Sequence, residues 1–175
     1  MKTILAFSGS NSKNSINQQL IHAVAKLEVK CNIEIIDLRD FPAPLYGIDE
    51  EVDNGIPPSM QLLREKFRNA DGFLISSPEH NGSMPAFMKS VLDWQSRQEG
   101  KIFMEKPAVF LSTSPGPRGG ASALKHILEI MPFRGAVIIG GHSVGSFSEK
   151  VTNGILNEGE DKEIILKLLT DLIGA

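Results

Sequence analysis

Short apolar runs alternate along the chain with longer segments whose apolar residues recur every three or four positions. The runs predict five strands, at residues 4–7, 33–37, 72–76, 108–113 and 136–139. The longer segments predict five helices, whose apolar faces are formed by Ile16, Leu20, Val24 and Leu27; Met60, Leu63 and Phe67; Met84, Phe87, Met88, Val91 and Leu92; Leu124, Ile127, Leu128 and Met131; and Ile164, Ile165, Leu168, Leu169 and Leu172. Short strands that are apolar almost throughout are typical of a parallel sheet between two helical layers. We therefore expect an α/β three-layer sandwich, with helices on both faces of a five-stranded parallel sheet.

Prolines and glycines set the expected boundaries of these elements. Pro57 and Pro58 suit the entry to the second helix, and Pro85 suits the first turn of the third. Residues 41–47 predict an irregular loop, because their prolines have no N–H for a strand ladder. The glycine-rich residues 140–146 follow the last predicted strand, and we expect a loop there as well.

Size, charge and cysteine content narrow the class of protein. With 175 residues, 41% of them hydrophobic, the chain is expected to form one domain spanning residues 1–175. The net charge of −3 is too small to indicate nucleic acid or an anionic membrane as a partner, which leaves a small-molecule ligand. No apolar run is long enough for a signal-peptide core or a membrane span, so we expect a cytoplasmic protein. The single cysteine, Cys31, agrees with a reducing compartment and is interpreted as structural.

The most informative segment is the polar turn between the first predicted strand and the first helix. The chain there reads Ser8-Gly9-Ser10-Asn11-Ser12-Lys13-Asn14-Ser15-Ile16-Asn17, and the helix begins near Ser15. Backbone amides, serine hydroxyls and the positive end of the helix dipole converge on such a turn, which suits a phosphate dianion. The turn matches neither the glycine fingerprint of dinucleotide folds nor the lysine-containing loop of nucleoside triphosphatases. A polar turn with a serine helix cap is the alternative interpretation.

Two further loops follow the third and fourth predicted strands, at residues 77–83 and 114–120. In a doubly wound sheet they lie on the same edge as the opening turn, where ligands bind. Both are rich in the Ser, Gly, Pro and Asn residues that a backbone-lined site requires. Ser83 is a candidate cap for the helix that follows. An ordinary strand-to-helix turn is the alternative for each loop, and Glu79 with His80 alone makes a poor metal site.

Other polar residues carry less information. Arg118 is interpreted as a solvated loop residue, with a ligand phosphate or a neighbouring subunit as the alternative. His22 and His126 fall within predicted helices and are assigned to packing or to the surface, whereas His142 is left open.

Taken together, these motifs resemble those of the NADPH-dependent FMN reductase family, the flavodoxin-like quinone, azo and chromate reductases. The turn is similar to the family's Gly-Ser-x-Arg-x-x-Ser-x-Asn, and Pro78-Glu79-His80-Asn81-Gly82-Ser83-Met84-Pro85 resembles its Pro-Glu-Tyr-Asn-Gly-Ser-x-Pro. The segment from Asp37 to Tyr46 resembles the family's loop after the second strand. Two residues depart from the pattern. Ser12 stands where the family has arginine, and His80 stands where it has tyrosine.

The resemblance implies a flavodoxin-like fold that binds FMN and takes hydride from NADPH or NADH. It assigns the phosphate to Ser10, Ser12, Ser15, Ile16 and Asn17, and the isoalloxazine to Pro78, Glu79, His80, Asn81, Gly82, Ser114, Gly116 and Gly119. It implies no catalytic acid or base, since the flavin carries the redox chemistry. The implied acceptors are quinones, azo compounds, metal oxyanions and free flavin, and the implied assembly is a homodimer or homotetramer.

Two other classes of protein stay open from the sequence. One is a flavodoxin-like electron carrier, which binds FMN without turning over NADPH; carriers are typically more acidic than this chain. The other is a binding protein of the same fold that has lost its flavin, which the serine at position 12 leaves open.

Overall fold

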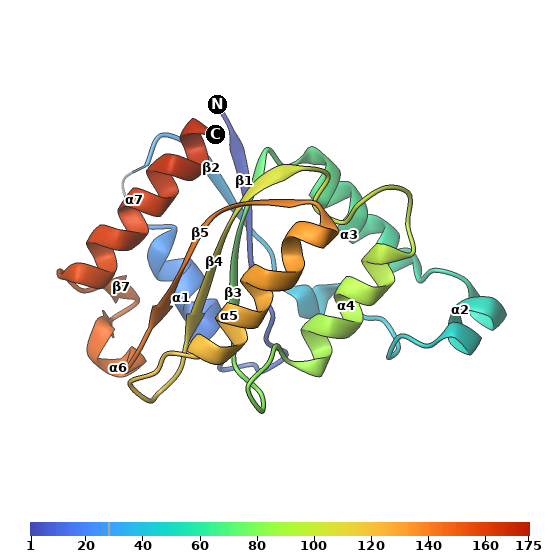
Figure 1. Cartoon of the computed structure of the whole chain (residues 1–175), viewed down its shortest axis with the longest axis horizontal. Helices are drawn as coiled ribbons and strands as arrows, with labels where there is room; N and C mark the ends of the chain where they lie inside the picture. The colour runs from blue at the N-terminus through green and yellow to red at the C-terminus, as the bar shows by residue number, and fades with distance from the viewer. Residues whose placement is uncertain (28) are drawn as a thin grey trace.

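Five parallel strands form one sheet in the computed structural model, which describes residues 1–27 and 29–175 (Figure 1). The sheet has the order β2-β1-β3-β4-β5. Its strands are β1 (Thr3–Ser8), β2 (Asn32–Ile35), β3 (Gly72–Ser77), β4 (Lys106–Thr113) and β5 (Ala136–Val144). All four pairings are parallel, so the predicted sheet and the doubly wound class are confirmed.

Alternate residues of the strands face two helical layers. Leu5 and Phe7 of β1 belong to a core beneath α3 (Pro58–Asn69), α4 (Ala86–Ser96) and α5 (Ala121–Ile130). Ile4 and Ala6 belong to the opposite core, beneath α1 (Ile16–Val24) and α7 (Glu160–Gly174). Figure 1 shows the two groups of helices on opposite sides of the sheet. The alternation explains why the inner strands β1, β3 and β4 are mostly apolar, since both of their faces are buried, whereas the edge strands β2 and β5 are only partly buried.

The fifth strand is longer than predicted. Gly140, Gly141, His142 and Ser143 belong to β5, so the expectation of a loop at these positions was wrong. A Cβ atom at Gly140 would lie 2.5 Å from Leu168 Cδ2, and one at Gly141 would lie 2.9 Å from the carbonyl oxygen of Phe110. Here glycine permits close packing between the strand and its neighbours, which is a different use from a flexible loop.

Helix boundaries differ from the pattern by a few residues. Leu27 lies beyond the end of α1 at Val24, and Met131 lies in a short 3₁₀ helix, η2 (Met131–Arg134). Pro85 immediately precedes the first turn of α4 instead of lying within it, which puts Met84 outside the helix. Pro58 occupies the first position of α3, as proline's fixed φ favours.

Several short elements carry too little periodicity to be seen in the sequence. They are η1 (Leu38–Asp40), α2 (Ile48–Asn54), α6 (Phe147–Lys150), β6 (Val151–Thr152) and β7 (Ile155–Leu156). α2 buries none of its residues and projects from the body of the molecule after the irregular residues 41–47 (Figure 1). Among the helices described, none combines the length and apolar character that a bilayer crossing requires.

Candidate functional site

The three polar loops meet at one edge of the sheet. β1 and β3 end in register, with Ser8 beside Ser76, and β3 and β4 end with Ser77 beside Ser112. The amide of Gly9, the first residue of the opening turn, donates to the carbonyl oxygen of Ser76 at 2.9 Å. The expectation that these loops share the carboxyl edge of the sheet is therefore confirmed.

Asn17, at the start of α1, links this helix to the ends of β3 and β4 through its side chain. It is only 2% exposed, and its Oδ1 accepts hydrogen bonds from the Thr113 amide at 3.1 Å and from Ser76 Oγ at 2.7 Å. Its Nδ2 donates to the carbonyl oxygen of Thr113 at 3.1 Å. The Oδ1 atom and one Nδ2 hydrogen are thus engaged within the protein, and the backbone amide of Asn17 is the group that we consider for a ligand.

The opening turn is organised by its own serines. Ser15 caps α1, because its Oγ accepts a hydrogen bond from the Gln18 amide at 3.1 Å. Earlier in the turn, three serine hydroxyls each accept a hydrogen bond from the amide two residues later. Ser8 accepts from Ser10, Ser10 from Ser12, and Ser12 from Asn14, at 3.2 to 3.3 Å. Among the described residues none of these hydroxyls donates a hydrogen bond, and those of the half-buried Ser10 and the exposed Ser12 can offer their hydrogens to an external acceptor.

The first turn of α1 supplies backbone donors to the same concavity. The amides of Ile16 and Asn17 precede the first carbonyl that an α-helix provides as a partner, and no acceptor for them occurs among the described residues. The N-terminal end of a helix also carries partial positive charge. The turn therefore presents uncharged donors to an anion, with the exposed Lys13 as its one cationic side chain.

The loop after β3 ends in a tight turn. The amide of His80 donates to the carbonyl oxygen of Ser83 at 2.9 Å, and the amide of Ser83 returns a bond of 3.1 Å. Asn81 and Gly82 both have positive φ, at 52° and 79°, which favours Asn-Gly at this turn. His80, Asn81 and Gly82 are exposed at its tip.

Ser83 does not cap α4, contrary to the expectation from the sequence. Its Oγ lies 2.9 Å from His126 Nδ1 on α5, and the cap position of α4 is occupied by Pro85. The serine therefore fastens the β3 loop to the neighbouring helix.

Glu79 connects the β3 loop to the beginning of α5. Its Oε2 accepts hydrogen bonds from the amides of Ser122 at 3.0 Å and Ala123 at 3.1 Å. A carboxylate at this position satisfies two unpaired amides and interacts favourably with the helix dipole. The Glu79 carboxylate is therefore engaged within the protein, and it holds the β3 loop in place.

The loop after β4 is also held by hydrogen bonds. Ser114 Oγ donates to the carbonyl oxygen of Gly116 at 3.1 Å, and that oxygen also accepts from the amide of Ser146 at 2.9 Å. Gly119 is buried with a φ of +58°, and a Cβ there would lie 2.7 Å from the backbone of Val144. Gly119 thus serves close packing, whereas Gly116 is exposed and borders open space.

Arg118, interpreted from the sequence as a solvated loop residue, and His142, which the sequence left open, both have partners inside the chain. Arg118 Nη2 donates to Ser122 Oγ at 2.7 Å, so its guanidinium folds back on α5. His142 Nε2 lies 2.7 Å from Asp161 Oδ1, and Lys150 Nζ lies 2.9 Å from the other oxygen. Burial acts to raise the pKa of Asp161, but the hydrogen bonds from Lys150 and His142 outweigh it and lower the value. These contacts fasten β5, α6 and α7 together.

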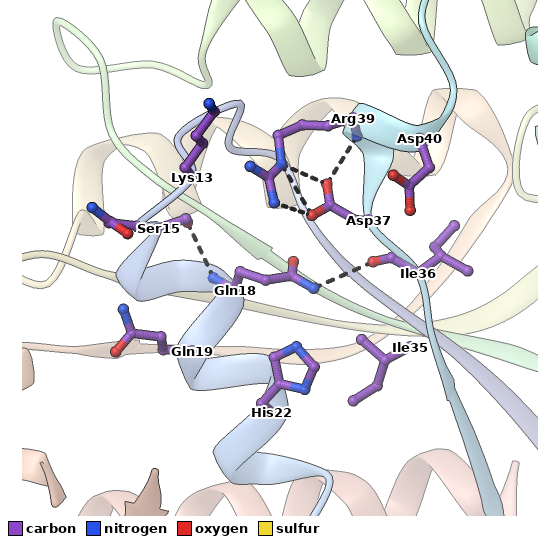
Figure 2. Close-up of a pocket in the computed structure, with 11 residues that line it drawn as sticks. Lys13, Ser15, Gln18, Gln19, His22, Ile35, Ile36, Asp37, Arg39 and Asp40 are labelled. Carbon is purple, nitrogen blue, oxygen red and sulfur yellow. Dashed lines mark hydrogen bonds and ion pairs between the residues drawn. The ribbon is translucent and has the colours of Figure 1, made fainter. Parts of the chain in front are cut away.

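A polar groove of about 430 Å³ lies beside the opening turn, and sequence reasoning did not identify it (Figure 2). Ser15 and His22 contribute to its α1 side, whereas Asp37, Arg39 and Asp40 come from the end of β2 and from η1. The sequence held only an indirect signal, the Asp-Leu-Arg-Asp segment whose resemblance to a family loop carried no assigned role. Among the described residues, no group of three or more His, Cys, Asp or Glu side chains is arranged to hold a metal ion.

Comparison with known proteins gives a consistent result. The model of the NADPH-dependent FMN reductase family matches residues 2–168. A quinone reductase of Escherichia coli K12 is 32% identical over 141 residues, which cover 78% of this chain and 72% of the relative. An NAD(P)H-dependent FMN reductase of Pseudomonas aeruginosa is 34% identical over 131 residues, covering 74% and 69%.

Solved structures agree with these relatives. The flavoenzyme NAD(P)H:(acceptor) oxidoreductase FerB of Paracoccus denitrificans has a TM-score of 0.83 and 25% identity, with coverage of 99% of this chain and 98% of the other. The azoreductase AzrA shares the fold, with a TM-score of 0.57 at 19% identity and coverage of 98% and 97%. This chain therefore belongs to the NADPH-dependent FMN reductase family and is an oxidoreductase that uses FMN with NAD(P)H as the electron donor.

Proposed function

We propose that the opening turn holds the FMN phosphate and that the isoalloxazine lies between the loops at residues 78–82 and 114–119. The observation that carries this proposal is the convergence of unpaired donors at the first turn of α1, next to two loops that Asn17 ties to it. Bound FMN supplies the redox chemistry by accepting hydride from NAD(P)H and delivering electrons to an acceptor. The protein itself binds and orients the FMN, the NAD(P)H and the acceptor.

Not every residue assigned from the resemblance has the same role in this proposal. Ser10, Ser12 and Ser15 offer hydroxyl hydrogens to the phosphate, and Ile16 and Asn17 offer backbone amides. Uncharged donors at a helix N-terminus are sufficient to bind a phosphate. Because Ser12 carries no charge, Lys13 is the cation nearest in sequence that can add to this attraction.

The ring site uses the backbone of two loops. Pro78, Asn81 and Ser114 are accessible to a ligand, and a Cβ at Gly82 or Gly116 would meet no atom within 4 Å, which leaves room for a planar group. Glu79 and Gly119 act indirectly, because one clamps the β3 loop to α5 and the other permits the β4 loop to pack against β5. Loops fixed in this way lose little conformational entropy when a ligand binds.

A quinone is the acceptor we propose. The relatives named above include a quinone reductase, and an NADPH:quinone oxidoreductase of Arabidopsis thaliana is 37% identical over 134 residues, covering 74% of this chain and 66% of the relative. A hollow of about 400 Å³ beside the β3 loop, lined by His80, Asn81, Met84 and His126 among others, offers space next to the proposed ring. Azo compounds, metal oxyanions and free flavin are competing acceptors.

The test is a steady-state assay with the purified FMN-loaded protein. Oxidation of NADPH and NADH is followed with a quinone, an azo dye, chromate and free FMN at matched concentrations. The highest kcat/KM is expected for the quinone. Another acceptor with a higher value would replace the quinone, and FMN binding without turnover of any donor would identify an electron carrier.

Three further properties belong to the same proposal. We infer a single domain over residues 1–175, because both apolar cores extend along the same sheet. The lone cysteine, Cys31, supports a place in the reducing cytoplasm. We expect a homodimer or homotetramer, since family members assemble in this way, and light scattering of the FMN-loaded protein measures the mass directly.

A further inference from the structure

The groove beside the opening turn is formed by two parts of the chain that meet at the carboxyl ends of β1 and β2. Lys13, Asn14 and Ser15 belong to the turn that we assign to the FMN phosphate, and they also line the groove. The groove therefore begins where the phosphate site ends. Its volume of about 430 Å³ lies in the range of small-ligand sites, which is roughly 300 to 1,000 Å³.

One end of the groove holds two carboxylates and the guanidinium of Arg39. Asp37 Oδ1 accepts a hydrogen bond from the Arg39 amide at 2.9 Å, and the Arg39 guanidinium donates to both carboxylate oxygens, with Nε at 2.9 and 3.0 Å. These bonds hold the pKa of the Asp37 carboxyl below its ordinary value, so it is ionised near neutral pH. Asp40, on the same side, has no hydrogen bond to its carboxylate among the described residues.

The other end has a different character. His22 and Ile35 lie there, away from Asp37 and Asp40 (Figure 2). An imidazole and an aliphatic side chain offer a flat heterocycle a partly apolar surface. The groove thus combines an end that offers hydrogen-bond acceptors with a surface that suits a nucleobase.

A carboxylate at the end of the second strand, beside a phosphate-binding turn, is the arrangement that dinucleotide-binding folds use for an adenosine ribose. A carboxylate accepts the hydrogens of the ribose hydroxyls, and it repels a phosphate attached at the 2′ position. In this groove Arg39 is already engaged by Asp37, which leaves Asp40 to add a second negative charge. Lys13 lies on the side of the turn, where a pyrophosphate would pass.

We propose that this groove binds the adenosine half of the nicotinamide donor, that Asp40 accepts its ribose hydroxyls next to the Arg39-bound Asp37, and that the protein consequently prefers NADH to NADPH. The inference rests on the proposed function, because it requires the nicotinamide to reach a flavin held by the neighbouring loops. The adenine lies against His22 and Ile35, and the pyrophosphate passes Lys13.

The experiment compares kcat/KM for NADH and NADPH in the FMN-loaded protein with a quinone as acceptor. Asp40→Asn is the first variant, because this exposed carboxylate can be neutralised without removing an internal contact, and Asp37→Asn is the second. Glu34→Gln is the matched control: Glu34 lies on β2 outside the groove, and pairs with Lys66 at 2.7 Å. Each groove variant is expected to raise the NADPH/NADH ratio about tenfold or more, since each removes a negative charge that repels the 2′-phosphate, whereas the control leaves it unchanged.

Calorimetry provides a readout separate from turnover. The FMN-loaded protein is titrated with 5′-AMP and with 2′,5′-ADP, which differ by the 2′-phosphate. The wild type is expected to bind 5′-AMP more tightly, and Asp40→Asn is expected to reduce or reverse the difference.

Two results would overturn the inference. One is a wild-type preference for NADPH and 2′,5′-ADP, which would indicate that Lys13 and Arg39 read a phosphate. The other is a ratio that stays within about twofold of wild type in both groove variants, since a lost charge repulsion is expected to be larger. Neither result affects FMN binding, so failure of the inference is distinguished from failure of the proposed function by the flavin absorbance and by the reaction with either donor.

Discussion

Replacing Asn17 with alanine tests whether one buried amide organises the flavin site. The substitution removes three hydrogen bonds and leaves the Thr113 amide and carbonyl and the Ser76 hydroxyl without this partner. A buried polar group without a partner costs about 1–3 kcal/mol. Since Ser76 can rotate toward another acceptor, we count the two backbone groups and expect a loss of about 2–6 kcal/mol in the free energy of unfolding.

The assay is urea unfolding of the FMN-free and FMN-loaded proteins, together with a fluorescence titration of FMN. Because the loops after β1, β3 and β4 lose their common link, FMN affinity is expected to fall as well as stability. Asn32→Ala is the matched control, since Asn32 is exposed at the opposite end of the sheet and its side chain makes one long bond of 3.5 Å to Thr3 among the described residues. A loss below about 1 kcal/mol relative to this control, with FMN affinity unchanged, would refute the reasoning, because even one unpaired buried group costs that much.

Four other substitutions have defined outcomes. Ser15→Asp is expected to weaken FMN binding about a hundredfold or more in a fluorescence titration, because a carboxylate repels the phosphate; an unchanged Kd places the ligand elsewhere. Ser12→Arg is expected to tighten FMN about tenfold or more, with a gain that shrinks in salt; equal wild-type affinity for riboflavin and FMN would contradict this. His80→Tyr is expected to shift the FMN midpoint potential, because the ring beside the proposed isoalloxazine site changes from an imidazole to a phenol; an unchanged potential excludes this role. Asp161 has a pKa below 3.8, so its stabilising contribution is complete above that value and is lost as pH falls through the lower folded pKa; Asp161→Asn is expected to reduce the acid dependence of unfolding, which a pH series of urea melts measures.

The parts of the fold that follow a strong periodic pattern were predictable from the sequence. Five apolar strands that alternate with amphipathic helices fit only a few sheet topologies. Parallel pairing of the strands then brings the three loops together at the carboxyl edge of the sheet. The extent of β5 was not predictable in this way. Gly140 and Gly141 break the apolar run, and the reason for glycine there is the close approach of Leu168 and Phe110, which local sequence does not show.

The candidate site shows a similar division. The residue types in the three loops were sufficient to locate a site, but the roles of individual side chains depend on contacts across the sheet. Asn17 and Glu79 looked like ligand contacts, and each is engaged by backbone groups of another loop or helix. The groove at Asp37 was not predictable from local sequence, because it combines residues from α1 with residues some twenty positions later in the chain.

The charges along the opening turn and its groove connect the proposed FMN phosphate site to the proposed choice of donor. Ser12 removes a positive charge where the family has arginine, and Arg39 directs its guanidinium to Asp37. Asp40 adds a carboxylate that has no hydrogen-bonding partner in the described chain. Because Arg39 is paired with Asp37, Lys13 is the main cation at the turn. One lysine with amide donors suits a single FMN phosphate. A dinucleotide with an additional 2′-phosphate would bring about two more negative charges to a groove whose other described cation, Arg39, is paired with Asp37. The same charge distribution therefore supports both FMN binding by uncharged donors and the proposed preference for NADH.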